Sequence, residues 1–191
     1  MTETILRAPL ILVVGPSGAG KDSLMMGAAE RLAKNPHFHF ARRVVTRPVQ
    51  PGGEAHDSIA PEVFAALEQD GFFLLSWRAH GLAYGVPRDL DSRRQDGVAV
   101  IANVSRSVIE AARCHCSPVG VIAVTAPIGQ LAERLAARGR EDAQDIRRRL
   151  ERASAGLPRG ADVVTLVNDS SLDTGIERFV TALERLYPAG S

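Results

Sequence analysis

A glycine-rich turn between a buried strand and a helix restricts this chain to few folds. The apolar run Leu10–Val14 predicts a central strand, and the residues Gly15–Lys21 that follow fit the pattern G-x-x-x-x-G-K. Between Asp22 and Lys34 the apolar residues recur at helical spacing, so that a strand, a loop and a helix follow one another. Glycines leave backbone N–H groups open to phosphate oxygens, and the helix directs its positive end at the same anions. The sequence therefore predicts a phosphate-binding loop.

This loop contains the candidate ligands of ATP, the expected phosphoryl donor. Lys21 is placed to reach the β- and γ-phosphates, where its charge offsets the charge that develops as the bond breaks. A plain glycine turn with a lysine that caps the helix is the competing interpretation, and the strand before the loop and the helix after it disfavour that interpretation. The candidate ATP ligands in this segment are Gly15, Pro16, Ser17, Gly18, Ala19, Gly20, Lys21, Asp22 and Ser23.

Position 22 departs from the pattern, which has serine or threonine there to bind magnesium. This chain has Asp22, followed by Ser23. Magnesium accepts carboxylate oxygens directly or through water, so Asp22 and Ser23 are candidate ligands of Mg²⁺. The other interpretation is that Asp22 stabilises the first turn of the helix, where an acidic side chain is favourable. The sequence leaves both interpretations open.

The remaining segments alternate between strand-like and helix-like patterns, which predicts an α/β fold with a mainly parallel sheet in three α/β/α layers. The length of 191 residues suits one domain. A loop is expected at 48–57, where proline and glycine are frequent. Further strands are expected at 40–46, 72–77, 83–86, 98–104, 120–124 and 163–167, and helices at 60–69, 105–113, 129–137, 141–155 and 172–186.

Charge and hydropathy argue against several classes of function. The net charge of +1 disfavours a surface that binds nucleic-acid phosphates. No stretch reaches the roughly 20 apolar residues that span a bilayer, and the N-terminal residues lack the features of a signal peptide. Cys114 and Cys116 are too close for an unstrained disulfide and lack partners for a zinc site, so we expect two thiols in a reducing cytoplasm. A homodimer is left open.

Arginines that follow the first helix predict a second anion site, for an acceptor that carries its own phosphate. The segment 40–46 contains Arg42 and Arg43, ends in Thr46 and is followed by Arg47. Guanidinium groups bind phosphate through two parallel N–H groups, which makes Arg43 and Arg47 candidate ligands. We expect one arginine of the pair at 42 and 43 to be solvated.

The stretch from Trp77 to Gly85 is the second part of this expected site. Its polar side chains crowd around glycines, which is typical of a pocket wall as well as of a core. Tyr84, with a hydroxyl between small residues, is the better candidate for a phosphate ligand. Trp77 is expected to serve in packing.

Arginines also cluster late in the chain, around a glycine. The helices expected at 129–137 and 141–155 flank Gly139 and are rich in arginine. A helical hairpin of this kind can close over ATP, exclude water and neutralise charge in the transition state. Since most of a charge run faces solvent, we select Arg138 and Arg149 as candidate catalytic arginines, together with Lys21 and Arg47.

The order of these motifs resembles the guanylate kinase family over nearly the whole chain. The resemblance implies a single P-loop NTPase domain over 1–191, with a core at 1–38 and 95–187, an acceptor-binding insertion at about 39–94 and a helical lid at about 134–155. It also implies that Asn168 lies on the adenosine-side loop and contributes to ATP binding. The motifs that carry the resemblance are Gly15–Lys21, Thr46–Arg47, Gly53–Glu54, Asp57, Phe73, Gly81, Tyr84–Gly85, Arg138–Gly139, Ile146, Arg148–Leu150 and Val167–Asp169.

The departures from that family concern the recognition of guanine. The resemblance places a glutamate and an aspartate as guanine-reading residues where this chain has Leu75 and Ser105. A second phosphate-binding arginine is replaced by Gln50, and a tyrosine by Ser58. Loss of the carboxylates removes the basis for selecting that base, because matched hydrogen bonds can separate substrates by several orders of magnitude.

A more particular combination of motifs is similar to the ribose 1,5-bisphosphate phosphokinases, guanylate-kinase-like enzymes of bacterial phosphonate breakdown. It consists of Gly-Lys-Asp-Ser at 20–23, Thr-Arg-Pro at 46–48, Gly-Gly-Glu-x-His-Asp at 52–57 and Trp-x-Ala-His-Gly-Leu-x-Tyr-Gly at 77–85. The resemblance implies ATP-dependent phosphorylation of ribose 1,5-bisphosphate, a small phosphosugar, to 5-phosphoribosyl 1-diphosphate. The candidate acceptor ligands are Arg43, Thr46, Arg47, Glu54, His56, Asp57, His80, Tyr84 and Asn103.

Two rival functions remain at this point. One is a true guanylate kinase, or another nucleoside monophosphate kinase with altered base contacts. The other is a non-catalytic interaction module with a guanylate-kinase-like fold. The intact Gly20–Lys21 pair and the late arginines argue against the module, which has no need of them.

Overall fold

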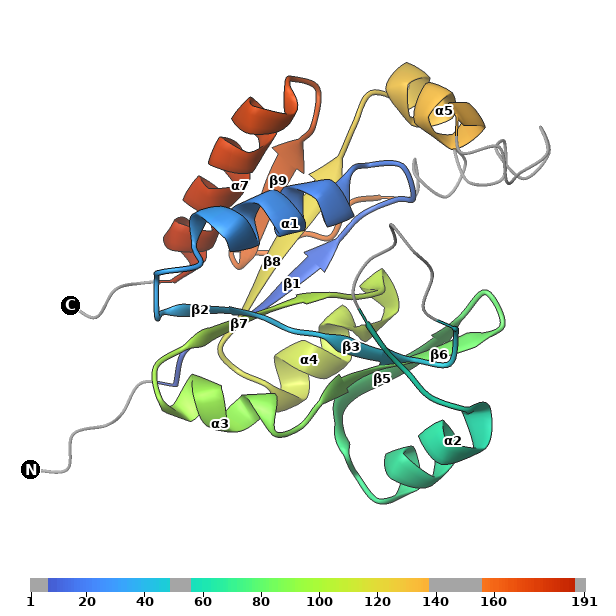
Figure 1. The fold of residues 1–191 in the computed structure, drawn as a ribbon. Helices are drawn as coiled ribbons and strands as arrows, with labels where there is room; N and C mark the ends of the chain where they lie inside the picture. The colour runs from blue at the N-terminus through green and yellow to red at the C-terminus, as the bar shows by residue number, and fades with distance from the viewer. Residues whose placement is uncertain (1–6, 49–55, 138–155, 188–191) are drawn as a thin grey trace, which may run out of the picture. The chain divides into compact units, whose positions relative to one another are not determined.

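Strand β1 (Leu10–Val14) is buried along its whole length, as expected for consecutive apolar side chains in a central strand. The computed structural model describes residues 7–48, 56–137 and 156–187, the side chains of 133–137 excepted. The chain divides into two units, residues 1–12 with 33–119 and residues 13–32 with 120–191. β1 therefore begins in the first unit and ends in the second (Figure 1).

The second unit contains the elements around the glycine-rich loop. Helices α1 and α7 pack against each other, and β8 and β9 pair in parallel (Figure 1). The strand order continues from β1 to β8 and then to β9. Ser171 begins α7, since its Oγ accepts a hydrogen bond from the Thr174 N–H. The described elements are α1 (Lys21–Arg31), β8 (Val119–Thr125), α5 (Ile128–Ala137), β9 (Val163–Val167) and α7 (Leu172–Leu186).

The first unit contains two parallel strands of its own beside the first part of β1. From β1 the strand order runs to β7 and then to β2, which pairs with β7 in parallel. Helix α3 packs against β7, and a 3-10 turn leads into helix α4. The bounds are β2 (Phe38–Phe40), α3 (Leu90–Gln95), β7 (Ala99–Asn103), η1 (Arg106–Val108) and α4 (Ile109–His115).

Arg94 joins three segments inside the first unit. Its side chain is fully buried and donates to the carbonyl oxygens of Ala8, Pro118 and Cys116, while Asp91 accepts a further hydrogen bond at 2.7 Å. Burial lowers the pKa of the guanidinium, and the Asp91 carboxylate opposes that shift. Because an unpaired buried charge would be costly, these acceptors explain how an arginine is tolerated here.

A second sheet of four strands lies wholly within the first unit and is called the acceptor sheet below. Its order is β4-β3-β6-β5, with β3 and β4 parallel and the other pairs antiparallel. β5 and β6 form a hairpin whose turn is His80–Gly81, with positive φ angles of 52° and 73°. The bounds are β3 (Arg43–Val45), β4 (His56–Ser58), β5 (Phe73–Ala79) and β6 (Leu82–Pro87).

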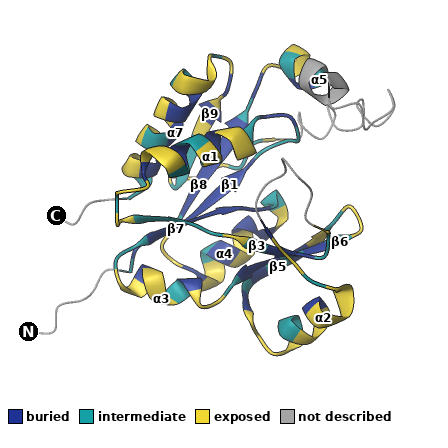
Figure 2. Cartoon of the chain, viewed as in Figure 1, coloured by how far each residue is buried: buried dark blue, intermediate teal, exposed yellow. Residues whose placement is uncertain are grey.

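Helix α2 (Pro61–Gln69) covers one face of the acceptor sheet. Phe64 is fully buried and stacks on Phe73 with ring centroids 4.5 Å apart, in a cluster that includes Val44 and Ala83. At the edge of this cluster, Glu68 on α2 accepts hydrogen bonds from Ser76 and Arg78 on β5. The buried side of the helix and its exposed side are distinct in Figure 2.

The structure differs from the sequence-based expectation in three elements. The strand expected at 40–46 is two strands in different sheets, because the N–H of Ala41 still pairs with Ile101 and the chain then leaves for β3. Strand β4 begins at His56, inside the expected loop, and α3 was not expected. Both segments are polar, so apolar periodicity gave no signal for them.

No helix in the described ranges is both long enough and apolar enough to cross a membrane. Cys114 is exposed and Cys116 is buried, both as free thiols. Burial raises the pKa of the Cys116 thiol.

The packing of α2 on the acceptor sheet predicts that Gly85→Ala destabilises the protein. A Cβ at position 85 would lie 2.3 Å from Cδ1 of Phe73, a ring already stacked on Phe64, so the ring has little room to yield. We expect the free energy of unfolding in urea to fall by about 1–3 kcal/mol. Gly129→Ala is the control, since a Cβ there meets no atom within 4 Å. Equal stability of the Gly85 variant and the wild type would contradict this packing argument.

Candidate active site

The glycine-rich loop begins where β1 passes close to β8. Gly15 has a φ of 150°, and a Cβ at this position would lie 2.0 Å from the carbonyl oxygen of Val124. Gly18 and Gly20 also have positive φ angles, of 85° and 86°. Only glycine satisfies both the close approach and these backbone angles without strain. The sequence pattern therefore has a direct steric cause in this fold.

Lys21 is the first residue of α1 and lies back over the loop. Its Nζ donates hydrogen bonds to the carbonyl oxygens of Gly15 at 2.9 Å and Pro16 at 3.0 Å. The ammonium group is thus held beside the N-terminus of α1, where the helix dipole also favours anions.

A hollow of about 70 Å³ opens at this loop. Asp22 and Ser23, in the first turn of α1, are exposed and belong to its lining. Among the described residues there is no group of three or more His, Cys, Asp and Glu side chains that could hold a metal ion. One carboxylate and one hydroxyl beside a phosphate site nevertheless fit Mg²⁺, which is bound by few protein ligands together with substrate phosphates. The lining residues are Ser17, Gly18, Gly20, Lys21, Asp22 and Ser23.

The loop after β9 is hydrogen-bonded to the glycine-rich loop. Asn168 is 6% exposed and its Nδ2 donates to the carbonyl oxygen of Ala19 at 2.9 Å. Asp169, the next residue, pairs with Arg178 on α7 at 3.0 Å. The Oγ of Ser170 is buried without a hydrogen-bond partner among the described residues. A donor-side loop at this position was expected from the resemblance, but the tether of Asn168 to Ala19 was not.

On the acceptor sheet, Thr46 and Arg47 follow the end of β3. The N–H of Ala83 donates to Thr46 Oγ1 at 2.8 Å, while the N–H of Thr46 donates to the Ala83 carbonyl oxygen at 3.1 Å. The Thr46 hydroxyl therefore fastens β3 to β6. Arg47 follows at once, and its Nε is buried with no hydrogen-bond partner in the part of the chain that the structure describes. An anion beside this nitrogen would supply the missing hydrogen bond.

His56 supports Arg47 from β4. The imidazole is 2% exposed, and its Nε2 lies 3.1 Å from the carbonyl oxygen of Arg47. Asp57, next on the strand, is exposed and pairs with the exposed Arg42 at 2.9 Å. His56 thus contacts the backbone of Arg47, a candidate acceptor ligand. Of the neighbouring arginines Arg42 and Arg43, Arg42 is the solvated one, as expected.

Arg43 and Tyr84 come together with Trp77, and we call these three side chains the aromatic cluster. The rings of Trp77 and Tyr84 stack with centroids 5.4 Å apart and an interplanar angle of 5°. The Arg43 guanidinium carbon lies 5.3 Å from the centroid of the Tyr84 ring and 5.9 Å from that of Trp77. Sequence reasoning treated Trp77 as packing alone. The two-residue turn at His80–Gly81 was the available signal, since it pairs Trp77 with Tyr84.

The other candidate residues are more dispersed. His80 is exposed at the tip of the β5–β6 hairpin, and Asn103 is buried at the end of β7. Leu75 is buried on β5, and Ser105 caps η1 by accepting from the Ser107 N–H. Glu54, Arg138 and Arg149 lie outside the described residues.

Comparison with known proteins identifies the class first and then the family. No protein-family model matches the chain. The fold matches a crystal structure of guanylate kinase from Anaplasma phagocytophilum with a TM-score of 0.67 and 20% identity, over 96% of this chain and 88% of that one. The predicted guanylate-kinase-like α/β fold of the P-loop NTPase class is thereby confirmed.

Relatives in sequence define the family more narrowly. Ribose 1,5-bisphosphate phosphokinase PhnN of Agrobacterium fabrum is 43% identical over 176 residues, 92% of this chain and 96% of that protein. A bifunctional ribose 1,5-bisphosphokinase-thymidine phosphorylase of Cupriavidus pinatubonensis is 48% identical over 180 residues, 94% of this chain. The chain spans less than a third of the length of the bifunctional relatives it matches. The chain belongs to the ribose 1,5-bisphosphate phosphokinase family, as the resemblance indicated.

The hollow at the loop leads to a test of the two interpretations of Asp22. If its carboxylate holds Mg²⁺ beside the phosphates, Asp22→Asn raises the Mg²⁺ concentration for half-maximal ADP release at fixed ATP by roughly tenfold. If Asp22 only stabilises the helix, the Mg²⁺ dependence is unchanged and the free energy of unfolding falls by about 0.3–1 kcal/mol. Glu30→Gln, farther along the same helix, is the matched control, for which the Mg²⁺ dependence stays that of the wild type.

Proposed function

We propose that this chain transfers the γ-phosphoryl group of ATP to ribose 1,5-bisphosphate, releasing ADP and 5-phosphoribosyl 1-diphosphate. Arg47 carries the proposal, since it lies two residues after the end of β3 in the acceptor sheet and its buried Nε has no hydrogen-bond partner among the described residues. The names of relatives that match this chain over nearly all of their own length support the same reaction.

On the donor side, the residues of the loop bind and orient the phosphates of ATP. The backbone N–H groups around Gly18 and Gly20 surround the phosphates, and Lys21 exchanges its contacts with loop carbonyls for contacts with phosphate oxygens. Asn168 keeps the loop in place through Ala19. Mg²⁺, when bound at Asp22 and Ser23, supplies further neutralisation of the phosphate charge.

On the acceptor side, the nucleophile is an oxygen of the 1-phosphate. It is already ionised at neutral pH, so the transfer needs no strong general base. A bond forms between this oxygen and the γ-phosphorus, and the bond to the bridging oxygen of ADP breaks, so that ADP leaves with the electron pair. Arg47 holds the accepting phosphate in line and offsets its charge.

The remaining steps of the proposal concern residues outside the described ranges. We expect Arg138 and Arg149 to neutralise the charge that spreads over the transferred group. The division into a core, an acceptor-binding part and a lid stays a prediction.

Selection against a guanine nucleotide follows from the absence of two carboxylates that would accept hydrogen bonds from the base. The amino group and ring N–H of guanine need acceptors, and the positions expected to supply them hold Leu75, which is buried and apolar, and Ser105. A phosphosugar has no base and needs only cations and hydroxyl partners. The rival reading as a guanylate kinase is disfavoured on this ground, and the non-catalytic module by Lys21.

A panel of acceptors tests the proposal directly. Release of ADP is measured in a coupled assay with ribose 1,5-bisphosphate, GMP and AMP at equal concentrations. We expect turnover of the bisphosphate at least 100-fold above that of either nucleotide, a margin within what matched hydrogen bonding supplies. Comparable turnover of GMP would overturn the proposed function. Protein that binds ATP but releases no ADP with any acceptor would support the module.

Arg47→Ala separates use of the acceptor from binding of ATP. Loss of a charged donor pair to phosphate is expected to lower kcat/KM for ribose 1,5-bisphosphate on the order of 100-fold, with KM for ATP little changed. Arg42→Ala is the matched control on the same segment, because Arg42 already pairs with Asp57 on an exposed surface. Equal losses for ATP and for the acceptor would refute the assignment of Arg47.

A further inference from the structure

The proposed acceptor carries two phosphates, and only one of them receives the γ-phosphoryl group. Arg47 accounts for the receiving phosphate. The other one, at the 5-position of the sugar, needs a cation of its own, because an uncompensated dianion would repel the charge gathered at the reacting centre. The aromatic cluster on the acceptor sheet contains such a cation.

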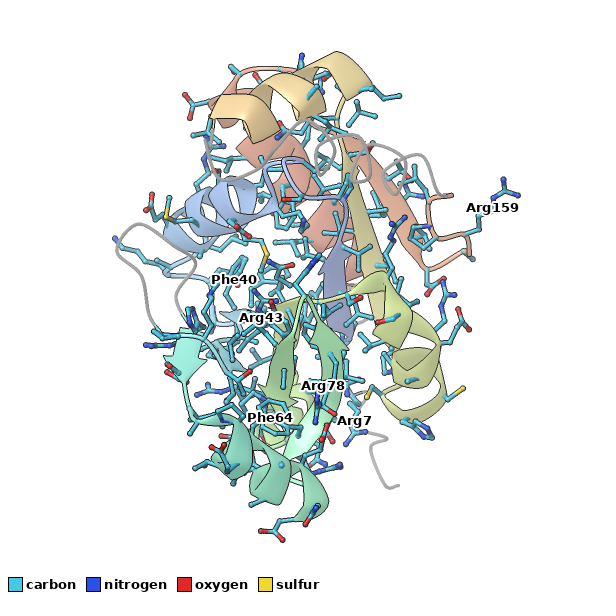
Figure 3. The ribbon with its side chains drawn as sticks, turned by 90° about the vertical axis from the view of Figure 1, so that its right-hand side faces the viewer. Arg7, Phe40, Arg43, Phe64, Arg78 and Arg159 are labelled. Atoms are coloured by element: carbon cyan, nitrogen blue, oxygen red, sulfur yellow. The ribbon has the colours of Figure 1, made fainter. Side chains whose placement is uncertain are left out.

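The strand register places the aromatic cluster on one face of this sheet. Trp77 lies opposite Tyr84 across the hairpin, and Tyr84 lies opposite Val45 on β3. Arg43 is two residues before Val45 and so shares its face, as a diagonal neighbour of Tyr84. The aromatic cluster therefore combines one side chain from each of the strands β3, β5 and β6. Arg43 is labelled in Figure 3.

The guanidinium of Arg43 lies over both rings of the aromatic cluster, within the range of a cation–π contact. Aromatic rings contact a guanidinium through its face, whereas its N–H groups point outward in its own plane. A stacked arginine can therefore still donate two parallel hydrogen bonds to an anion, with less orientational freedom to lose.

The same unit contains an example of this arrangement. The guanidinium carbon of Arg78 lies 5.1 Å from the centroid of the Phe64 ring, and NH1 donates to Glu68 Oε1 at 3.0 Å. NH2 donates to the other carboxylate oxygen at 2.5 Å. These hydrogen bonds, with one from Ser76, lower the pKa of Glu68 to about 2. A guanidinium that contacts an aromatic ring here also binds an anion through two nitrogens.

We propose that Arg43 binds the acceptor phosphate that does not receive the γ-phosphoryl group, and that Trp77 is a positioning residue that fixes the plane of its guanidinium. The inference rests on the proposed function, since it assigns the second phosphate of that acceptor. Trp77 is only 7% exposed, so we expect it to act on the acceptor through Arg43 and not by direct contact.

The first test compares two acceptors that differ by this phosphate, ribose 1,5-bisphosphate and ribose 1-phosphate. Arg43→Ala is expected to lower kcat/KM on the order of 100-fold for the bisphosphate and to leave that for ribose 1-phosphate near the wild-type value. Arg43→Lys keeps the charge but loses the planar pair of donors, so its kcat/KM for the bisphosphate should lie between those of the wild type and Arg43→Ala. Equal losses on both acceptors would overturn the assignment. Arg42→Ala is the control and should change neither.

The second test uses fluorescence, because Trp77 is the single tryptophan of the chain. Titration of the wild type with ribose 1,5-bisphosphate, without ATP, should change the emission saturably, as the guanidinium above the indole takes up an anion. Arg43→Ala should abolish this response. A wild type that turns over the bisphosphate with no change in emission would contradict the role of the aromatic cluster.

Kinetics of two Trp77 variants separate positioning from folding. Trp77→Leu should raise KM for the bisphosphate roughly tenfold with kcat and KM for ATP little changed, and Trp77→Phe should restore most of the loss by supplying a ring face. If Trp77→Leu instead lowers kcat and raises KM for both ATP and the bisphosphate, and Trp77→Phe shows the same defects, the role of Trp77 is merely structural.

These outcomes are distinct from failure of the proposed function. If the wild type phosphorylates GMP and not the bisphosphate, the function itself is wrong. If the wild type phosphorylates the bisphosphate and Arg43→Ala loses activity equally on both sugars, the function stands and only this inference falls. A KM for ATP at the wild-type value shows that each variant is folded.

Discussion

One close approach determines the phosphate loop: the backbone at Gly15 passes the Val124 carbonyl, where a Cβ would lie 2.0 Å from the oxygen. Any larger residue would move the loop away from β8, together with the Lys21 ammonium that donates to Gly15. Asn168 fastens the same loop through Ala19. The directions of the backbone N–H groups are therefore set before any phosphate binds, which is the preorganisation that electrostatic catalysis requires.

Arginines in this chain differ in what compensates their charge. Arg94 is buried and donates to backbone carbonyl oxygens and to Asp91, so its removal would leave several acceptors unpaired. Arg42 and Arg78 pair with carboxylates at the surface, where such pairs contribute at most about 1 kcal/mol. Arg47 has a buried nitrogen with no partner among the described residues. The net charge of +1 does not reveal these differences, because it does not show which arginines are paired with acidic side chains.

The sequence predicted what depends on local pattern and missed what depends on pairing between distant segments. The strand at 163–167 and the helix at 172–186 have the predicted bounds, since apolar residues repeat clearly there. β4 has no apolar pattern and exists because β3 pairs with it. In the site, the turn at His80–Gly81 pairs Trp77 with Tyr84, a local signal that sequence reasoning did not use. The place of Arg43 above them depends on the register of β3 against β6, which no local signal determines.

The side chains on one face of β5 link the fold to selectivity. Leu75 and Trp77 occupy one face of β5 at 6% and 7% exposure, so this face offers an incoming acceptor no carboxylate to match the N–H groups of a base. Trp77 also stacks on Tyr84 beneath Arg43, and a smaller residue at 77 would remove one of the two rings that this guanidinium contacts. One face of β5 thus both lacks a carboxylate for a base and contributes a ring to the contact with Arg43. On the proposed function, the missing carboxylate disfavours a base and Trp77 favours a second phosphate, so a substitution at 77 should weaken recognition of the phosphate and leave the discrimination against a base unchanged.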